Sequence, residues 1–164
     1  ICCVRFGNIA WSTNSIFPIW KKMSVNNGII QSTGPNMRRF IFSVEDACKL
    51  VNRAIRNINK LNGLILSQKM KSAQISDILN IWGKKYKIKW ISSKSRPGDK
   101  VDEYLIGESE INNTKKIIID GIEHYIIEFN KKIKNHLKKA ISSENANKLS
   151  KSEILDLINN EPKI

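Results

Sequence analysis

The chain has 164 residues, of which 41% are hydrophobic and 26% are charged, a composition typical of one globular domain and not of a disordered chain. No apolar run approaches the roughly 20 residues that a membrane-spanning helix needs. No basic start followed by a long apolar stretch marks a secretory leader. We therefore expect a cytoplasmic protein without a membrane span.

The net charge of +13 and the isoelectric point near 9.8 indicate an anionic partner. Nucleic acid is one candidate, but no helix-turn-helix, zinc knuckle or RNP-like aromatic set is visible. The chain is also rich in Ile, Asn and Lys together, as A/T-rich codons would produce, which weakens the charge signal. A small anionic substrate explains part of the charge equally well, so a basic nucleic-acid-binding protein is the less favoured alternative.

The first half of the chain predicts two helices among short strands. Residues 1–6 have strand character, residues 15–24 suit a short helix, and residues 39–42 suit an extended segment. The clearest helix covers residues 43–59, because apolar side chains recur there at helical spacing. Ser43 is its expected N-cap.

The middle of the chain alternates between strand and helix patterns. Residues 63–67 predict a strand, and residues 74–82 predict a helix that Gly83 ends. Residues 86–91 alternate polar and apolar side chains, as a strand does.

A sharp turn is predicted at Pro97 and Gly98, because proline and then glycine suit the two central positions of a type II turn. Arg96 precedes this turn and Asp99 follows it, so a cation and a carboxylate are held near one bend. Residues 101–106 are then expected to form a short helix.

The last third predicts a strand and two helices. Residues 122–129 are strand-like, and residues 131–141 are expected to form a helix whose lysine-rich face is solvated. A final helix begins at Ser150, with Glu153 completing a capping box. Strands and helices alternate along the chain, so the fold class is α/β or α+β.

The chain opens on the apolar run ICCVRF with no turn or cap before it, so we expect it to be the C-terminal part of a longer protein. Its cysteines, Cys2, Cys3 and Cys48, do not form a disulfide framework. No cysteine or acid is spaced with His124 or His136 as metal ligands are. The sequence therefore predicts free thiols and no metal site.

No GxGxxG, Walker loop or GxSxG motif is present, so no residue of this chain is assigned a catalytic role. What remains are polar groups that suit an anion, because the arginine fork matches phosphate and ligands bind at element ends in α/β folds. These groups are the pairs Arg5 and Asn8, Arg38 and Arg39, and Arg96 and Asp99.

Five motifs in one order carry a resemblance: VRFGN, IFPIW, NMRRFIFSVEDACKLV, SQKMKSAQISDIL and RPGDKVDEYLIGESE. The series is similar to the C-terminal half of the extended short-chain dehydrogenase/reductases. More narrowly, it resembles the CapD-like polysaccharide-biosynthesis enzymes, which are UDP-N-acetylglucosamine 4,6-dehydratases and related epimerases. The closing SSENANKLSKSEILDLI is similar to the tail of the same group, so the resemblance runs from about Val4 to Ile158.

In that family the N-terminal half is a Rossmann domain that binds NAD or NADP, and the C-terminal half closes over a UDP-sugar. The resemblance implies an α/β fold, the C-terminal portion of a Rossmann-type extended enzyme with an α+β substrate-binding region. It implies three parts. Residues 1–10 end the Rossmann-like domain, residues 11–110 bind the UDP-sugar, and residues 111–164 form a C-terminal helical tail.

The resemblance also implies roles for individual residues. Asn8 would contact the sugar diphosphate, Arg39 and Arg96 would hold the pyrophosphate, and Asp99 would bond the uridine ribose. Phe6 and Gly7 would lie near the nicotinamide. These roles agree with the chemistry of the side chains, because two phosphates suit two arginine forks and a diol suits a carboxylate acceptor.

The chain also departs from the family pattern. The glycine-rich cofactor loop and the Tyr-x-x-x-Lys pair are absent, so we expect a fragment that is inactive alone. Trp11 stands in the loop AWSTNS, where the family has a glycine-rich segment. The expected function is nucleotide-sugar modification of the UDP-N-acetylglucosamine 4,6-dehydratase type, with a UDP-glucose or UDP-N-acetylglucosamine 4-epimerase as the alternative. The complete enzyme is expected to be a homo-oligomer.

Overall fold

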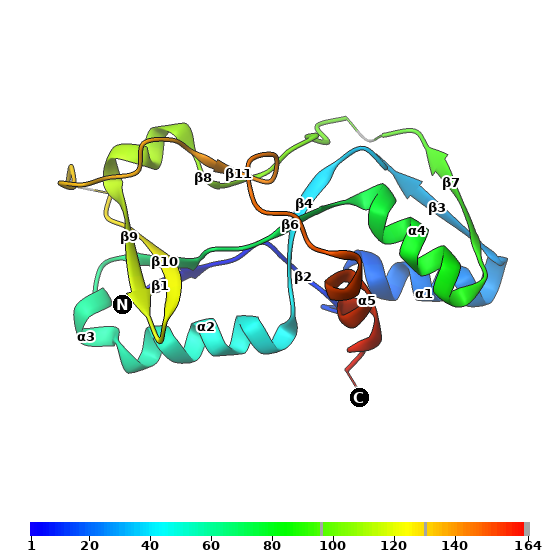
Figure 1. Cartoon of the computed structure of the whole chain (residues 1–164), viewed down its shortest axis with the longest axis horizontal. Coiled ribbons are helices and arrows are strands. Elements are labelled where there is room, and N and C mark those ends of the chain that lie inside the picture. Colours follow the sequence, from blue (N-terminus) through cyan, green and yellow to red (C-terminus); the bar gives the residue numbers. More distant parts are fainter. Residues whose placement is uncertain (96, 130, 163–164) are drawn as a thin grey trace.

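The computed structural model describes residues 1–95, 97–129 and 131–162 (Figure 1). Its helices are α1 (Ile16–Asn27), α2 (Val44–Arg56), α3 (Ile58–Leu61), α4 (Ile75–Tyr86), the 3-10 helix η1 (Glu108–Asn113) and α5 (Lys151–Asn159). Its strands are β1 (Cys3–Arg5), β2 (Asn8–Ile9), β3 (Ile29–Thr33), β4 (Arg38–Phe42), β5 (Ile65–Gln68), β6 (Ser72–Gln74), β7 (Lys89–Ser93), β8 (Tyr104–Ile106), β9 (Thr114–Ile119), β10 (Ile122–Ile127) and β11 (Ile141–Ser142).

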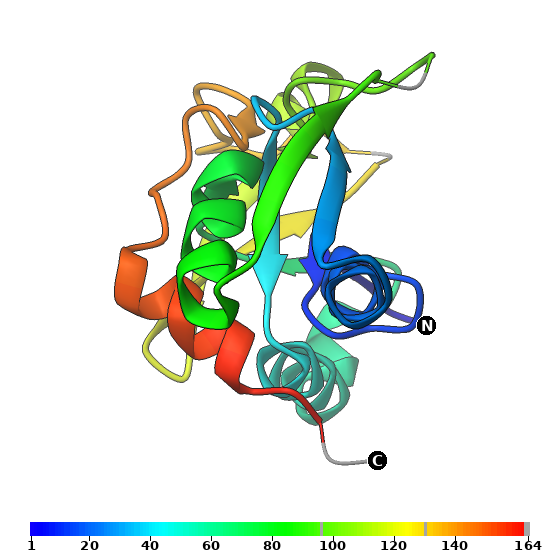
Figure 2. The ribbon, with the colours of Figure 1, turned by 90° about the vertical axis from the view of Figure 1, so that its right-hand side faces the viewer.

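The molecule is elongated, with a sheet at each end (Figure 1). At one end a four-stranded sheet has the order β1-β5-β10-β9, in which β1 and β5 are parallel and β10 is antiparallel to both of its neighbours. At the other end β3 and β7 pair in parallel from Ile29 to Thr33, with α1 and α4 beside them (Figure 2). The fold is therefore α/β with added antiparallel strands.

The strand β4 joins the two ends of the molecule. It lies between β2 and β6 in a three-stranded sheet, parallel to β2 and antiparallel to β6. Asn8 is opposite Ile41, and Arg39 is opposite Ala73. This pairing places β2, near the start of the chain, and β6 on either side of β4.

The helix α2 covers one face of the four-stranded sheet (Figure 1). Its Leu50 is fully buried and packs with Leu66 and Ile127 of the sheet. The helix begins as predicted, because the Ser43 hydroxyl accepts a hydrogen bond from the Asp46 amide at 3.0 Å. These contacts form one of the two hydrophobic cores.

The second core is aromatic and lies between α1, α4 and α5. Trp82 is 1% exposed, and its ring centroid is 5.9 Å from that of Trp11, 5.7 Å from that of Phe17 and 5.9 Å from that of Trp20. Such tilted and edge-on ring pairs are favourable arrangements for aromatic side chains. This cluster fixes α1 against α4.

Most of the predicted elements are confirmed. Gly98 has a φ of 88°, as the third position of a type II turn requires. The capping box of the last helix is also present, with Glu153 accepting from the Ser150 amide at 2.8 Å and donating its own amide to the Ser150 hydroxyl. The confirmed helices are those predicted at 15–24, 43–59, 74–82 and from Ser150, and the confirmed strands are those at 1–6, 39–42, 63–67 and 122–129. The strand predicted at 86–91 is present but begins later, at Lys89.

The prediction that Gly83 ends a helix is wrong. The helix α4 continues to Tyr86, and Lys87 ends it in the left-handed conformation with a φ of 55°. Gly83 has a packing role, since a Cβ there would lie 2.7 Å from the carbonyl oxygen of Ile88. The glycine lets the following chain turn back closely against the helix.

Two predicted helices are absent from the structure. Residues 101–106 form a bend followed by the strand β8, which pairs with β11. In the described part of 131–141, backbone amides bond to another segment, with Ile133 donating to Asn112 at 3.0 Å and Leu137 to Thr114 at 2.9 Å. These long-range bonds replace the local ones that a helix would need. In the described part of 111–164, the α-helix α5 and the end of the 3-10 helix η1 stand beside the strands β9, β10 and β11, so the range is mixed and not wholly helical.

His124 is fully buried in the strand β10. Its Nδ1 is 2.8 Å from the carbonyl oxygen of Ile122, and its Nε2 has no hydrogen-bond partner among the described residues. Burial, and then the positive charge of Arg53, lower the pKa of His124. The folded chain therefore holds this imidazole neutral.

We expect the stability of the fold to decrease as the pH falls from 7.5 to 5.5. The unfolded chain takes up a proton on His124 near its ordinary pKa of about 6.5, whereas burial makes the folded chain take it up only at lower pH, so acid favours unfolding. Urea unfolding at several pH values measures this slope. His124→Gln should flatten it and the exposed His136→Gln should not, and equal slopes in all three proteins would contradict the assignment.

Candidate functional site

A cavity of about 390 Å³ lies between α1, β3 and β4. Asn8, Arg39 and Asp99 all line it, although they come from distant parts of the sequence. The remaining wall is largely apolar and includes Trp20 and Met23 of α1. The predicted substrate-binding residues are thus brought together, except Arg96, which lies outside the described residues.

Arg39 ties the strand β4 to the segment that follows the predicted turn. Its guanidinium is mostly buried, with 17% of the side chain exposed, and its Nε lies 3.2 Å from the carboxylate of Glu103. This contact is an ion pair, and the Glu103 side chain in it is partly exposed. The terminal nitrogens donate to the carbonyl oxygens of Arg38 at 2.8 Å, Lys100 at 2.9 Å and Val101 at 3.2 Å.

Asn8 is held by two acceptors on neighbouring elements. Its Nδ2 donates to the carbonyl oxygen of Phe40 at 3.1 Å and to Oε2 of Glu103 at 3.0 Å. Glu103 therefore bridges Asn8 and Arg39, with one carboxylate oxygen on each. We name Asn8 Nδ2 and Arg39 Nε the donor pair.

The other arginines of the predicted anion-binding pairs form ion pairs within the chain. Arg5 and Glu110 share two hydrogen bonds of 2.8 Å, and Arg38 lies 2.5 Å from Asp102. Hydrogen bonds from these arginines lower the pKa of both carboxyl groups. Neither arginine lines the cavity, so of the described arginines in those pairs Arg39 alone does.

Phe6 and Gly7, which the resemblance places near a cofactor, lie next to β4 and do not line the cavity. Phe6 is half-buried against the core beneath the four-stranded sheet. Gly7 approaches Phe40 so closely that a Cβ on it would lie 2.4 Å from the Phe40 Cβ. Only glycine fits this contact between the two segments.

Trp11 gives the loop after Asn8 a packing role. Its φ is 62°, and its indole Nε1 donates to the carbonyl oxygen of Leu157 at 2.8 Å. The loop is thereby fixed to the last helix, α5, and the ring joins the aromatic core. In this chain the loop between Asn8 and α1 is held by burial of an aromatic side chain and contains no glycine.

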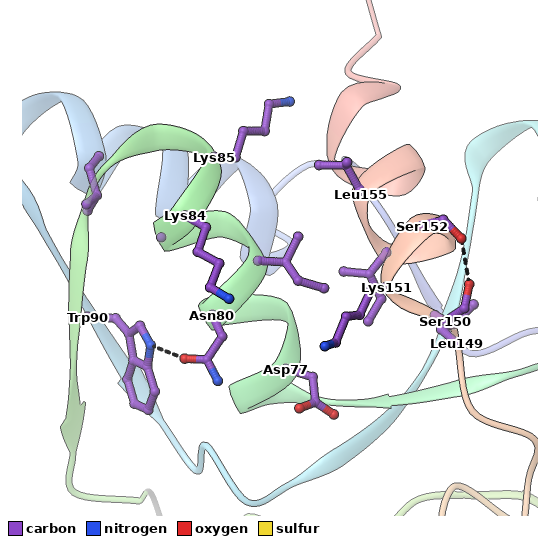
Figure 3. Close-up of a pocket in the computed structure, with 14 residues that line it drawn as sticks. Asp77, Asn80, Lys84, Lys85, Trp90, Leu149, Ser150, Lys151, Ser152 and Leu155 are labelled. Atoms are coloured by element: carbon purple, nitrogen blue, oxygen red, sulfur yellow. Dashed lines mark hydrogen bonds between the residues drawn. The ribbon is translucent and has the colours of Figure 1, made fainter.

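A larger hollow of about 1210 Å³ lies between α4, β7 and α5, and Figure 3 shows it. Its polar groups include Asn80, which accepts from the Trp90 indole at 3.0 Å, and the side chains of Lys84 and Lys151. None of the predicted site residues that the structure describes lines it. The smaller cavity is therefore the candidate site.

Sequence reasoning missed Glu103 as a member of the site. The residue lies at the end of RPGDKVDE, and this acid four positions after Asp99 was the signal available. Its backbone is anchored by Ser143, which accepts from the Glu103 amide at 3.0 Å through its hydroxyl and donates its own amide to the Glu103 carbonyl at 2.8 Å. This long-range contact cannot be seen in a local motif.

No helix in the described ranges is long and apolar enough to cross a membrane. The polysaccharide biosynthesis protein family matches residues 1–125 of the chain. An uncharacterized membrane protein of Methanocaldococcus jannaschii is 37% identical over 125 residues, which are 70% of this chain and 36% of that protein. The capsular polysaccharide biosynthesis protein CapD of Staphylococcus aureus is 29% identical over 130 residues, 75% of this chain and 22% of CapD.

A UDP-glucose 4-epimerase of Rickettsia bellii is 29% identical over 173 residues, which cover 97% of this chain and 49% of that protein. The X-ray structure of Pen from Bacillus thuringiensis matches with a TM-score of 0.83 at 25% identity, over 98% of this chain and 48% of the Pen chain. The chain thus spans half or less of the length of these relatives. The matches confirm the α/β class and the predicted resemblance to the C-terminal part of an extended short-chain dehydrogenase/reductase. The chain belongs to the polysaccharide biosynthesis protein family.

Proposed function

We propose that this chain supplies the UDP-sugar-binding part of an enzyme that modifies nucleotide-sugars for surface polysaccharides. The observation that carries the proposal is the cavity that Asn8, Arg39 and Asp99 line together. An amide donor, a guanidinium and a carboxylate around an apolar wall match the diphosphate, ribose and ring faces of such a ligand.

Each residue has a role in this proposal. Asn8 and Arg39 contact the diphosphate, and Asp99 accepts hydrogen bonds from the ribose hydroxyls. Arg96 is assigned to the second phosphate on its motif alone. Phe6 and Gly7 face the nicotinamide of NAD or NADP in the complete enzyme. No residue of this chain is given a catalytic role.

The family supports nucleotide-sugar modification in general, and the proposal of a particular reaction rests on the sequence motifs. The motifs favour a UDP-N-acetylglucosamine 4,6-dehydratase, and the name of the Rickettsia bellii relative favours a 4-epimerase as the alternative. We assign residues 1–10 to the end of a Rossmann-like domain, 11–110 to the substrate region and 111–164 to the C-terminal tail. The complete enzyme is proposed to be a cytoplasmic homo-oligomer.

The free edge of the described four-stranded sheet is consistent with the proposal that the complete enzyme has a cofactor-binding domain. β1 is the terminal strand of the described sheet and is parallel to β5. Parallel strands are normally covered on both sides, so this edge suits a further parallel strand. A Rossmann domain that continues the sheet at β1 would place its cofactor beside Phe6 and Gly7.

Calorimetric titration of the chain with UDP, UDP-N-acetylglucosamine and UDP-glucose tests the proposal. We expect binding of the UDP-sugars that free UDP displaces. Absence of binding to all of them would overturn it. Binding to duplex DNA that weakens steeply with salt and that UDP does not displace would favour the nucleic-acid alternative, which the charge of +13 motivates.

Asp99→Ala is expected to weaken the binding of UDP and uridine alike by about 1.5–3 kcal/mol, the range for hydrogen bonds to a charged group. Pyrophosphate binding should not weaken, because the lost carboxylate faces the ribose. The matched control is Asp156→Ala, an exposed acid on α5 outside the cavity. Equal losses for pyrophosphate and uridine would contradict the role of Asp99.

A further inference from the structure

Glu103 occupies the two donors that the proposed function assigns to a phosphate. Its Oε1 lies 3.2 Å from Arg39 Nε, and its Oε2 accepts from Asn8 Nδ2 at 3.0 Å. One carboxylate thus bridges the donor pair, one oxygen on each donor. A phosphate group can present two oxygens in a similar way, one to Asn8 Nδ2 and one to Arg39 Nε, and a guanidinium pairs favourably with either anion.

The contacts with Glu103 differ from the other contacts of Arg39. The terminal nitrogens of Arg39 donate to three backbone carbonyls, which can leave only if the chain itself moves, and Nη2 also donates to Met37 Sδ at 3.0 Å. The Glu103 side chain is 37% exposed and can rotate into solvent. Among the oxygen partners of Arg39 named here, the carboxylate is therefore the one that a ligand can displace.

The backbone of Glu103 is fixed independently of its side chain. Its amide and carbonyl both bond to Ser143, at 3.0 and 2.8 Å. The Ser143 hydroxyl also donates to Asp102 at 2.8 Å, which in turn pairs with Arg38. Rotation of the Glu103 side chain would therefore leave the segment 100–103 in place. The hydrogen bonds from Arg39 to the carbonyl oxygens of Lys100 and Val101 would also remain.

We propose that Glu103 is an affinity- and specificity-determining residue whose carboxylate fills the donor pair until a diphosphate displaces it. The inference rests on the proposed function, since that function assigns the donor pair to the diphosphate. A neutral nucleoside has no group that can replace the carboxylate, whereas a diphosphate does. Glu103 thereby lowers the affinity for phosphate-bearing ligands and supplies a counter-charge to Arg39 before a diphosphate binds.

The test compares Glu103→Gln with Glu144→Gln in the full chain, using pyrophosphate, UDP and uridine as ligands. Glu144 is 69% exposed and lies 3.4 Å from Arg38, so its replacement removes the same charge from the same region outside the cavity. Glu103→Gln keeps the size of the side chain and removes the competing charge. We expect pyrophosphate and UDP to bind roughly two- to fivefold more tightly, the effect of a half-exposed ion pair.

Uridine affinity should be unchanged in both variants, and Glu144→Gln should leave all three affinities near those of the parent chain. A Glu103→Gln variant that binds pyrophosphate no better than the parent, or an equal gain in Glu144→Gln, overturns the role of Glu103. Glu103→Ala gives a second reading, with the same direction of change and no amide that could pair with the donors.

The outcomes also separate this inference from the proposed function. Tighter pyrophosphate binding without any binding of UDP-sugars supports the displaced carboxylate and overturns the proposed function. If the parent chain binds UDP-sugars but Glu103→Gln binds pyrophosphate no more tightly than the parent does, the proposed function is supported and the role of Glu103 is overturned. Thermal melts of each variant establish that the protein is folded, which the Ser143 bonds to the Glu103 backbone favour.

Discussion

Trp82→Ala is expected to lower the free energy of unfolding by about 3–5 kcal/mol, the range for deleting a buried aromatic side chain. The indole is 1% exposed and lies within 6 Å of the rings of Trp11, Phe17 and Trp20, measured between centroids. Its removal leaves a cavity where α1, α4 and α5 meet. Because a domain of this kind is stable by only about 5–15 kcal/mol, the loss is a large share of the total.

Urea unfolding followed by far-ultraviolet circular dichroism measures this change. Trp90→Ala is the matched control, since that indole is half-buried at the edge of the large hollow and donates to the side chain of Asn80. We expect the control to lose clearly less stability than Trp82→Ala. Equal losses in the two variants would show that the aromatic cluster is not the centre of this core.

Arg39→Ala is expected to have the largest effect at the site, on stability and on ligand binding together. The guanidinium holds carbonyl oxygens of the segment 100–103 and the carboxylate of Glu103. Its loss should lower the free energy of unfolding by about 2–3 kcal/mol and the free energy of UDP binding by a similar amount. Urea unfolding and calorimetric titration with UDP measure the two effects.

Arg39→Lys separates charge from geometry. A lysine keeps the positive charge, but its single ammonium cannot reach the carbonyls of Lys100 and Val101 and the Glu103 carboxylate at once. We expect an intermediate loss in both measurements. Arg56→Ala, which removes an exposed arginine paired with Asp120, should change stability by at most about 1 kcal/mol. Full UDP affinity in Arg39→Ala would remove this residue from the site.

Elements that depend on neighbouring residues could be predicted from the sequence. The helix α2 begins at Ser43 and α5 at Ser150 because each cap is made within four residues of its helix start. The strand β5 and the turn at Gly98 also follow from local chemistry. In these places propensity, capping and packing favour the same structure.

Elements that depend on distant partners could not be predicted. Residues 131–141 have the apolar spacing of a helix, yet amides of Ile133 and Leu137 bond to the chain at Asn112 and Thr114.

The hairpin of β9 and β10, in contrast, did carry a local signal in the dipeptide Asp120-Gly121. In the structure both residues have positive φ angles, as a two-residue hairpin turn requires. An Asp-Gly pair between two apolar runs is the pattern to look for there.

The site divides in the same way. Asn8, Arg39 and Asp99 stand in motifs, so the sequence indicates them, and the structure places them around one cavity. Glu103 becomes part of the site only because β4 and the segment 100–103 lie side by side and bring Arg39 to it. The chemistry of the donor pair is therefore a property of the fold and not of any one motif.

The aromatic core has an optical consequence. Trp20 belongs to the cluster and also lines the candidate cavity, and its ring lies 5.9 Å from that of Trp82, which in turn lies 5.9 Å from Trp11. Excitation passes readily between indoles at such separations, so these three tryptophans emit as one group. A ligand that touches Trp20 should therefore change the fluorescence of the whole group.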